Sequence, residues 1–415
     1  RRGPNNTLPA PPGAPGSPWA IGASEGGHTA IHPELGNLEE FRRTVEEAHR
    51  LGLTIALDLA FQCSPDHPFV REHPEWFRHL PDGSIRPAEN PPKLYDDIYP
   101  IDFATPEWVP LWAALKGVVD YWISEGVRWF RVDNPHTKPF AFWQWLIAEV
   151  RREHPEVLFL AEAFTRPNVM YRLAKVGFTH SYTYFTWRTR KAEIVEYFQE
   201  LSSGPVAEFF RPHLWTNTPD ILAEQFHRGQ RSVFLHRFVL AATLSSHFGI
   251  YGPAYELLEH GALGPGTEEY RDSEKYEVRH WTLDAKESLA SEIGRINRIR
   301  RAHPALEAGR RPVFHAVDND ALLAYSRRTE DRSDMVLVVV NLDPEAVQTG
   351  WTTLDLAELG IPETESFEAR DLLSDETYHW RGPHNFVRLD PTRWSAHILH
   401  VARASTVAAL PSRSS

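Results

Sequence analysis

The sequence has little of several features that would mark particular classes of protein. Its 415 residues include one cysteine, Cys63, so no intrachain disulfide can form. No apolar run approaches the length of a membrane span, and the N-terminus lacks the charged-then-apolar pattern of a signal peptide. Positively charged residues are also outnumbered, with 44 Lys and Arg against 56 Asp and Glu, and the net charge of −12 argues against a nucleic-acid partner. We therefore expect a soluble, cytoplasmic protein.

Metal-binding patterns are missing as well. The N-terminal region contains His28, His32 and His67, but no zinc-like spacing joins them, so we predict no metal and no cofactor. Nothing near Cys63 in the sequence supplies a base, and we interpret it as a core or pocket-wall residue rather than a nucleophile.

What the chain does contain is a repeated alternation of helix and buried strand. Apolar residues recur at helical spacing from Leu38, Gly52 ends that helix, and the strand at 54–60 follows. The pattern returns through strands predicted at 127–133, 157–164, 181–185, 215–220 and 248–251, with helices between them. After about residue 311, β-type runs at 321–326, 335–340 and 396–401 follow one another mostly without helices. The first pattern is typical of an α/β barrel and the second of an antiparallel β-sandwich.

These patterns predict a domain organisation. We expect a (β/α)₈ TIM barrel over 1–310, which opens with a loop at 1–37 that is ordered over a site and is interrupted by an irregular, proline-rich subdomain at about 64–100. A β-sandwich over 311–402 and a disordered tail over 403–415 complete the chain. Only six barrel strands can be found, whereas a closed barrel needs eight, so we expect the first strands upstream of Arg1.

Acidic residues lie toward the ends of three of the predicted strands. Asp133 ends a buried strand, with Arg131 on the same strand face because side chains alternate. Glu162 ends the next strand, and Asp220 lies in the segment 215–220. A single acid at a strand end often only caps the next helix, but three at matching strand tips favour a catalytic site for glycosyl transfer.

The motifs resemble the α-amylase superfamily, glycoside hydrolase family 13. Within it they are most similar to the bacterial maltosyltransferase family that extends α-glucans from maltose-1-phosphate. The segments that carry the resemblance are Gly16–Gly22, Gln62–Pro68, Glu89–Lys93, Arg131–Pro139, Leu160–Phe164, Ser181–Arg188, Asn217–Asp220 and Asp272–Tyr276. Two departures are notable: Thr218-Pro219-Asp220 replaces the Asn-His-Asp of common amylases, as in the maltosyltransferases, and Arg2 stands where the family has Lys.

The resemblance implies roles for individual residues. Asp133 would be the nucleophile, Glu162 the general acid/base, and Asp220 the carboxylate that stabilises the oxocarbenium-like transition state. The donor phosphate would contact Ser17, Asn90, Lys93, Tyr95 and Asn134. The maltosyl unit would contact Gln62, Lys275 and Tyr276, or these residues would shape its pocket. Arg131 would lie beside the nucleophile and belong to the same binding site. Tyr182, Tyr184 and Trp187 either stack on sugar or pack the barrel.

The activity implied is retaining transfer of a maltosyl unit from α-maltose-1-phosphate to the non-reducing end of an α-1,4-glucan, with release of phosphate. The family forms homodimers, so the resemblance also implies a homodimer. Three alternatives stay open: another α-amylase-superfamily hydrolase or phosphorylase, a non-catalytic glucan-binding barrel, and a chain that is inactive because its first strands are missing.

Overall fold

The computed structural model describes residues 2–14, 17, 22–90, 93–307 and 311–403. The chain divides into two compact units. The first comprises Arg1–Tyr182, Phe209–Arg211 and Arg271–His280, and the second comprises Thr183–Glu208, Pro212–Tyr270 and Trp281–Ser415. None of the helices in the described ranges is long and apolar enough to cross a membrane. The predicted tail, apart from residue 403, lies outside the described residues.

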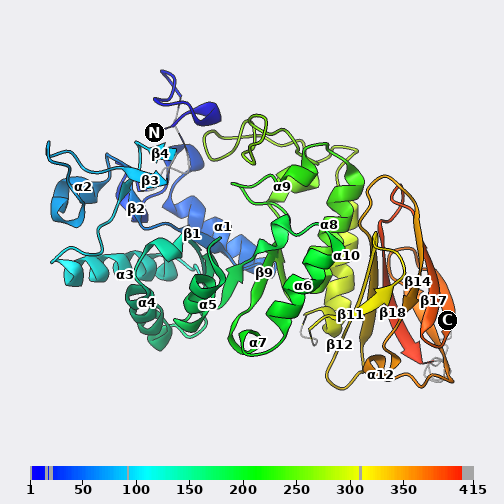
Figure 1. The fold of residues 1–415 in the computed structure, drawn as a ribbon. Helices are drawn as coiled ribbons and strands as arrows, with labels where there is room; N and C mark the ends of the chain where they lie inside the picture. The colour runs from blue at the N-terminus through cyan, green and yellow to red at the C-terminus, as the bar shows by residue number, and fades with distance from the viewer. Residues whose placement is uncertain (1, 15–16, 18–21, 91–92, 308–310, 404–415) are drawn as a thin grey trace. The chain divides into compact units, whose positions relative to one another are not determined.

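Helices and parallel strands alternate through the first unit (Figure 1). α1 (Leu38–Arg50) begins with a capping box, in which Asn37 and Glu40 each accept the other's backbone N–H. The elements that form the rest of the alternation are β1 (Ala56–Leu59), α3 (Trp108–Ser124), β6 (Trp129–Asp133), α4 (Phe140–Glu153), β7 (Leu158–Glu162), α5 (Pro167–Lys175) and β8 (His180–Tyr182). The four strands pair in the order β1-β6-β7-β8, all parallel, so their carboxyl ends lie along one edge.

One apolar core supports these strands. Phe130 in β6 stacks on Phe159 in β7 at a centroid distance of 5.7 Å, and both rings are fully buried. Trp143, Ile147 and Val150 of α4 pack into the same core, as the helical spacing predicts. The strand ends are therefore held on a rigid scaffold.

The segment between β1 and α3 is irregular, as its composition indicates. β2 (Gln62–Cys63) pairs antiparallel with β5 (Tyr99–Pro100), and α2 (Pro68–Glu72) and a hairpin of β3 (Ala88–Asn90) and β4 (Lys93–Tyr95) lie between them. Cys63 is buried, and burial raises the pKa of its thiol.

The second unit begins with the remaining α/β elements, which are α6 (Lys191–Ser202), α7 (Val206–Phe209, whose last residue belongs to the first unit), β9 (Pro212–Trp215), α8 (Arg231–Leu244), β10 (His247–Gly249), α9 (Gly252–Glu256), α10 (Ala290–Ala302) and α11 (Pro304–Glu307). β9 and β10 are parallel. The strand predicted at 215–220 was wrong: β9 ends at Trp215, and the Thr218–Ile221 turn follows. The strand predicted at 181–185 was also wrong beyond Tyr182, because residues 184–187 form a 3₁₀ turn whose first N–H is bound by the Tyr197 hydroxyl.

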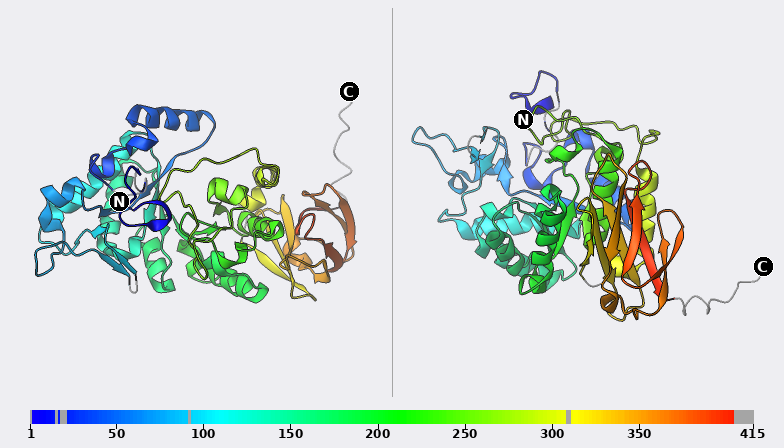
Figure 2. Two further views of the ribbon diagram at one scale, coloured as in Figure 1. Left: turned by 90° about the horizontal axis from the view of Figure 1, so that it is seen from above. Right: turned by 45° about the vertical axis from the view of Figure 1, so that its right-hand side comes forward.

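The C-terminal strands form one antiparallel sheet around a second apolar core (Figure 2). Its members are β11 (Val313–Val317), β12 (Leu322–Arg328), β13 (Met335–Asn341), β14 (Gln348–Thr353), β15 (Ser366–Asp371), β16 (Thr377–Arg381), β17 (His384–Leu389) and β18 (Ala396–Arg403), with the short helix α12 (Leu356–Leu359) between β14 and β15. The strand order is β16-β15-β18-β13-β12-β11-β14-β17. The boundary at about residue 310 stays a prediction, because residues 308–310 lie outside the described ranges.

Two buried arginines close the C-terminal end of α8. Arg300 of α10 donates to the carbonyls of Ala242, Ser245 and Ser246. Arg327 of β12 donates to the Thr243 and Leu306 carbonyls and to the Ser246 hydroxyl. The last carbonyls of a helix lack helical partners, and these guanidinium groups supply them.

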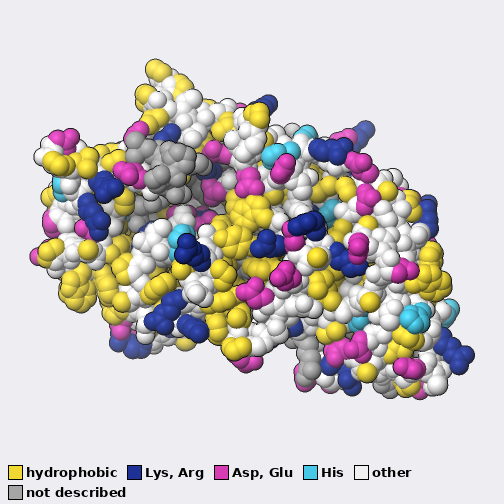
Figure 3. Space-filling model, viewed as in Figure 1, with side chains coloured by type: hydrophobic (Ala, Val, Ile, Leu, Met, Phe, Trp, Pro, Cys, Tyr) yellow, Lys and Arg dark blue, Asp and Glu magenta, His cyan; other side chains and the backbone are white. Residues whose placement is uncertain are grey.

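Charged side chains of both signs are interspersed on the face shown in Figure 3. The net charge of −12 is therefore not gathered into one acidic surface in this view.

Candidate active site

Three carboxylates and one arginine lie on neighbouring strands of the first unit. Asp58 in β1 is in register with Arg131 in β6, and Asp133 at the end of β6 is in register with Glu162 at the end of β7. Arg131 and Asp133 share one face of β6 because side chains alternate along a strand. The parallel register therefore gathers these groups at the carboxyl edge of the sheet.

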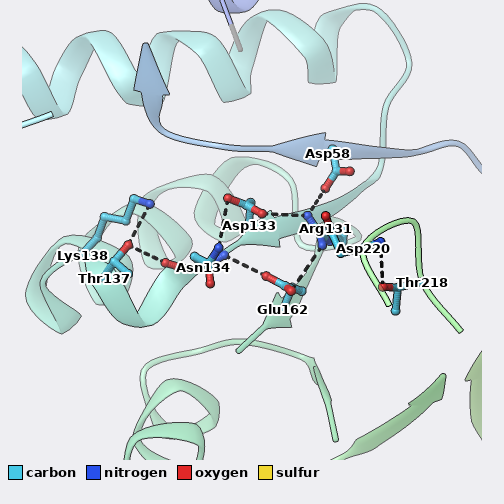
Figure 4. A network of polar contacts seen from close by, with 9 residues as sticks. All are labelled: Asp58, Arg131, Asp133, Asn134, Thr137, Lys138, Glu162, Thr218 and Asp220. Atoms are coloured by element: carbon cyan, nitrogen blue, oxygen red, sulfur yellow. Dashed lines mark hydrogen bonds and ion pairs between the residues drawn. The ribbon is translucent and has the colours of Figure 1, made fainter. Parts of the chain in front are cut away.

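Arg131 joins the carboxylates (Figure 4). Its Nη1 donates to Asp58 Oδ1 at 2.8 Å and to Asp133 Oδ1 at 3.1 Å, and its Nη2 lies 3.6 Å from Glu162 Oε1. Burial by itself would lower the pKa of Arg131, but the acidic groups around it, which also include Tyr182, hold that pKa well above its ordinary value. The guanidinium thus fixes three acids through charge-assisted contacts.

Asn134 connects Asp133 to the next strand. Its backbone has φ 42° and ψ 52°, the left-handed region, which asparagine tolerates better than most residues. In this conformation its N–H donates to Glu162 Oε2 at 3.1 Å, while its amide nitrogen lies 3.5 Å from Asp133 Oδ2. The following Pro135 begins a 3₁₀ turn over Pro135–Thr137.

A cation follows in the same segment. Lys138 Nζ donates to Thr137 Oγ1 at 3.0 Å, and the Thr137 hydroxyl donates to the Asn134 carbonyl at 2.8 Å (Figure 4). Burial lowers the pKa of Lys138, an effect opposed by the charges of Asp133 and Glu162.

His136 lies within this segment too. Burial and the Lys138 charge lower its pKa. Among the described residues, no hydrogen-bond partner reaches its buried Nδ1. Neither His136 nor Lys138 was a sequence-predicted site residue, although both lie within the matched segment Arg131–Pro139.

Asp58 is a further group that the sequence analysis did not assign to the site. It was visible as a carboxylate inside the apolar strand at 54–60. In the structure its side chain is 42% exposed and is paired with Arg131 at 2.8 Å.

Three predicted binding residues come together from segments far apart in sequence. The hydroxyl of Ser17, which is 8% exposed, donates to the carbonyl of Lys275. The Nζ of Lys275 lies 5.2 Å from the ring centroid of Tyr276. The same two segments are joined a second time, by hydrogen bonds of 2.9 and 2.8 Å between Asn5 and Asp272. The N-terminal loop is therefore tied to the segment Arg271–His280.

The other predicted binding residues lie in the irregular segment. Gln62 is half-buried in β2, and Tyr95 is half-buried at the end of β4. The backbones of Asn90 and Lys93 pair across the β3–β4 hairpin, and their side chains lie outside the described part of the chain. Arg2, the departure from the family noted in the sequence, donates to Asp97 at 3.1 Å.

His28 and His67 form a buried hydrogen-bonded chain. His67 Nδ1 accepts the Phe69 N–H, His67 Nε2 lies 2.9 Å from His28 Nδ1, and His28 Nε2 lies 2.9 Å from the Ala60 carbonyl. One neutral tautomer of each ring satisfies every contact. Burial and the neighbouring His28 lower the pKa of His67 to about 3. These histidines therefore link Phe69 to Ala60, the residue that follows the end of β1.

Asp220 belongs to the second unit. It follows β9 in a tight turn, where its N–H donates to Thr218 Oγ1 at 3.2 Å (Figure 4). The preceding Asn217 is 1% exposed, accepts the Tyr251 N–H at 2.8 Å and donates to the Tyr270 hydroxyl at 2.8 Å. The turn that carries Asp220 is thus fixed from both sides.

The three aromatic candidates differ in environment. Tyr182 is 2% exposed and lies beside the Arg131 guanidinium, at 5.6 Å from ring centroid to Cζ. In the second unit, Tyr184 and Trp187 are half-buried, and Trp187 Nε1 donates to Glu268 Oε1 at 2.7 Å. Tyr182 packs the barrel, whereas Tyr184 and Trp187 keep partly open rings.

Comparison with known sequences gives relatives over nearly the whole chain. The maltosyltransferase of Chlorobaculum tepidum (strain ATCC 49652 / DSM 12025 / NBRC 103806 / TLS), named alpha-1,4-glucan:maltose-1-phosphate maltosyltransferase, is 53% identical over 407 residues, which cover 97% of this chain and 61% of that protein. The maltosyltransferase 2 of Streptomyces coelicolor (strain ATCC BAA-471 / A3(2) / M145) is 53% identical over 414 residues, covering 99% and 61%. The family described as GLGE, C-terminal matches residues 314–401.

Solved structures share the fold. An α-amylase from Geobacillus thermoleovorans, complexed with acarbose, aligns with a TM-score of 0.71 at 16% identity, covering 91% of this chain and 84% of that one. An α-amylase from Lactobacillus plantarum aligns with a TM-score of 0.68 at 20% identity, covering 92% and 86%. These likenesses confirm the predicted fold class, a partial parallel α/β barrel followed by an antiparallel β-domain. The chain spans about three fifths of the length of its curated relatives, 61% of the Chlorobaculum tepidum protein; over 97% of its own length it is similar to α-1,4-glucan:maltose-1-phosphate maltosyltransferases, and it has the fold of the α-amylases.

Proposed function

We propose that the protein transfers a maltosyl unit from α-maltose-1-phosphate to the non-reducing end of an α-1,4-glucan, with retention of configuration and release of phosphate. The observation that carries this is the pairing of Asp133 with Glu162 at neighbouring strand ends under one arginine, in a chain 53% identical to a named maltosyltransferase. We keep the cytoplasm as the expected compartment and a homodimer as the expected assembly.

The reaction would proceed by double displacement. Asp133 attacks the anomeric carbon as phosphate leaves, giving a β-maltosyl enzyme. Glu162 then takes the proton of the acceptor's 4-hydroxyl, which attacks the same carbon and frees Asp133. Asp220 would stabilise the positive charge that develops on the sugar between these states.

Arg131 has a positioning role in this scheme. Its Nη1 donates to Asp133, and its Nη2 lies 3.6 Å from Glu162 Oε1, so a single planar group orients both carboxylates. Retaining enzymes need their two carboxyl groups about 5–5.5 Å apart, and fixing both side chains to one guanidinium limits that spacing.

The phosphate pocket would combine several polar groups with a cation. Ser17, Asn90, Lys93, Tyr95 and Asn134 are the proposed phosphate contacts, and Gln62, Lys275 and Tyr276 the proposed maltosyl contacts. Lys138 is a second cation in the segment that follows Asp133, and its charge favours an anionic leaving group. The scheme uses no cofactor.

The test is phosphate release from α-maltose-1-phosphate with maltohexaose as acceptor. We expect phosphate to appear together with products two glucose units longer. Asp133→Ala should reduce kcat on the order of 10⁴-fold or more, because the nucleophile is gone. The matched control is Asp120→Ala. Asp120 lies on α3, and its side chain is 42% exposed and pairs with Lys116. It should leave kcat unchanged.

Other outcomes would overturn the proposal. Reducing sugar without phosphate would indicate a hydrolase, and glucan binding without turnover would indicate a binding protein. A folded protein of the relatives' full length that released no phosphate would exclude maltosyl transfer. Light scattering on the same protein tests the dimer.

A further inference from the structure

A group of three potential metal ligands lies in the second unit, outside the proposed active site. His303 follows the last residue of α10, Asp334 precedes β13, and His400 lies on β18. Within the described ranges, it is the one set of three or more His, Cys, Asp or Glu side chains close enough to hold an ion. Three separate elements therefore bring imidazole and carboxylate groups to one place.

The geometry of the three groups is compact. His303 Nδ1 lies 2.8 Å from Asp334 Oδ1, His400 Nε2 lies 3.6 Å from the same oxygen, and the ligand atoms all lie within 4.8 Å of one another. A tetrahedral ion with bonds of about 2.1 Å needs its ligand atoms about 3.4 Å apart. Small rotations of the two imidazoles, whose centroids are 5.0 Å apart, would reach that spacing.

The carboxylate is positioned by its surroundings. Asp334 Oδ2 accepts the Ala305 N–H at 2.9 Å, and the Asp334 backbone is held at both its N–H and its carbonyl by Thr329. Such contacts fix the orientation of a metal ligand. Since Oδ2 is occupied, Oδ1 is the oxygen that faces the two histidines.

The simpler interpretation is a His303–Asp334 ion pair with a histidine beside it. That pair does not use His400, whose Nε2 is beyond hydrogen-bond distance of the shared oxygen. One opposing charge is present: Arg370 lies opposite His400 across the β15–β18 pair, and it contacts Asp375 at 3.3 Å. The His400 side chain is 34% exposed, which leaves a path for an ion and for a water as fourth ligand.

We propose that His303, Asp334 and His400 bind one Zn²⁺ per chain, with water in the fourth position. Two imidazole nitrogens and one carboxylate oxygen are ligands that Zn²⁺ accepts, and a three-residue set leaves one position open. The ion would tie the end of α10 to β13 and β18. Its role is structural, since it joins elements of the second unit.

The test is Zn²⁺ titration by calorimetry on tag-free protein treated with chelator. We expect one equivalent per chain and a rise in Tm of ~3 °C or more at saturation. His400→Gln and Asp334→Asn should each weaken binding about 100-fold or more, since even indirect ligand contacts are worth 10–100-fold. Co²⁺ in place of Zn²⁺ should give visible absorption that these variants lose.

The matched control is His397→Gln, because His397 also lies on β18 and pairs with one carboxylate, Asp371, at 2.9 Å. It should retain full Zn²⁺ affinity. No saturable binding, or equal affinity in His400→Gln and the unaltered protein, would overturn the proposal. If Asp334→Asn does not fold, as judged by circular dichroism, the partly exposed His400→Gln decides the outcome.

Discussion

Buried arginines serve different purposes in the two units. In the first unit, Arg131 faces the carboxylates of Asp58, Asp133 and Glu162. In the second, Arg300 and Arg327 face main-chain carbonyls, among them those of Ala242 and Thr243 in the last turn of α8. Burial lowers the pKa of Arg300 and Arg327 to about 10, whereas the carboxylates keep the pKa of Arg131 well above its ordinary value.

The difference shows how partner type separates a site from a scaffold. Carbonyls offset the burial of a guanidinium through hydrogen bonds and stabilise one fold. One carboxylate is enough to neutralise one guanidinium, so the several carboxylates around Arg131 are more than its burial requires. Their effect is to gather acidic groups at the carboxyl edge of the sheet. An excess of acids around one largely buried arginine is therefore the feature that points to chemistry.

Among the variants that test this comparison, Arg131→Lys should have the largest effect. A lysine keeps the charge but cannot reach Asp58, Asp133 and Glu162 in the planar arrangement that a guanidinium allows. We expect kcat for phosphate release to fall by about 10²–10³-fold, the scale of losing one oriented donor at a reacting group, with Tm little changed.

Arg128→Lys is the control for that variant. Arg128 lies just before β6 and donates to the carbonyls of Ile123 and Val127. It should keep its kcat. An Arg131→Lys variant with full activity would show that Arg131 only balances charge.

The reverse result is expected for Arg300→Met. Removing the guanidinium leaves the carbonyls of Ala242, Ser245 and Ser246 without their donor. We expect urea unfolding to show a loss of about 2–4 kcal/mol in the free energy of unfolding, with kcat per folded molecule unchanged. The neighbouring Arg301 is exposed, and Arg301→Met should cost little. A fall in kcat without loss of stability would reverse the comparison.

A smaller effect is expected on the pH dependence of stability, to which His67 of the first unit contributes. His67 of the first unit has a pKa lowered from 6.5 to about 3 by burial and by His28. Between those values the unfolded chain binds a proton that the native protein does not, so stability rises with pH, is fully present above 6.5 and is lost as pH falls toward 3. The slope from one such group is at most about 1.4 kcal/mol per pH unit.

Urea unfolding at pH 4.5, 5.5, 6.5 and 7.5 measures this slope. His67→Gln should flatten it, and His49→Gln, on the exposed face of α1, should not. An unchanged slope in His67→Gln would mean that the His28–His67 chain takes up a proton without cost.

Much of the fold could be predicted from the sequence, because the spacing of apolar residues indicates helices and strands and because glycine and proline mark where they end. The helix starting at Leu38, the strand ending in Asp133 and the strand ending in Glu162 follow directly from apolar spacing. The segments after Tyr182 and Trp215 could not be predicted, since aromatic and β-branched residues there favour strands while distant contacts turn the chain.

The site divides along the same line. Asp133 and Glu162 were visible as acids at strand tips, and parallel register brings them together. Asp58 required knowledge of which strands are neighbours, and the His303, Asp334 and His400 cluster required the tertiary fold, because sequence spacing reveals only ligands on one local segment. Long-range pairing is what composition and periodicity omit.

The smallest effect separates backbone from side chain at Asn134. Both Asn134→Gly and Asn134→Ala remove the amide beside Asp133, so kcat should fall equally in the two variants. Alanine must also adopt φ 42°, which costs about 1 kcal/mol more than glycine, and Asn134→Ala should have the lower Tm. In the second unit Arg332 has φ 58°, and its Gly and Ala variants should differ in Tm but not in kcat. If Asn134→Gly lost more activity than Asn134→Ala, the rigid left-handed turn that directs the N–H at Glu162 would itself contribute to catalysis, and the backbone of the first unit would then share the positioning role assigned to Arg131.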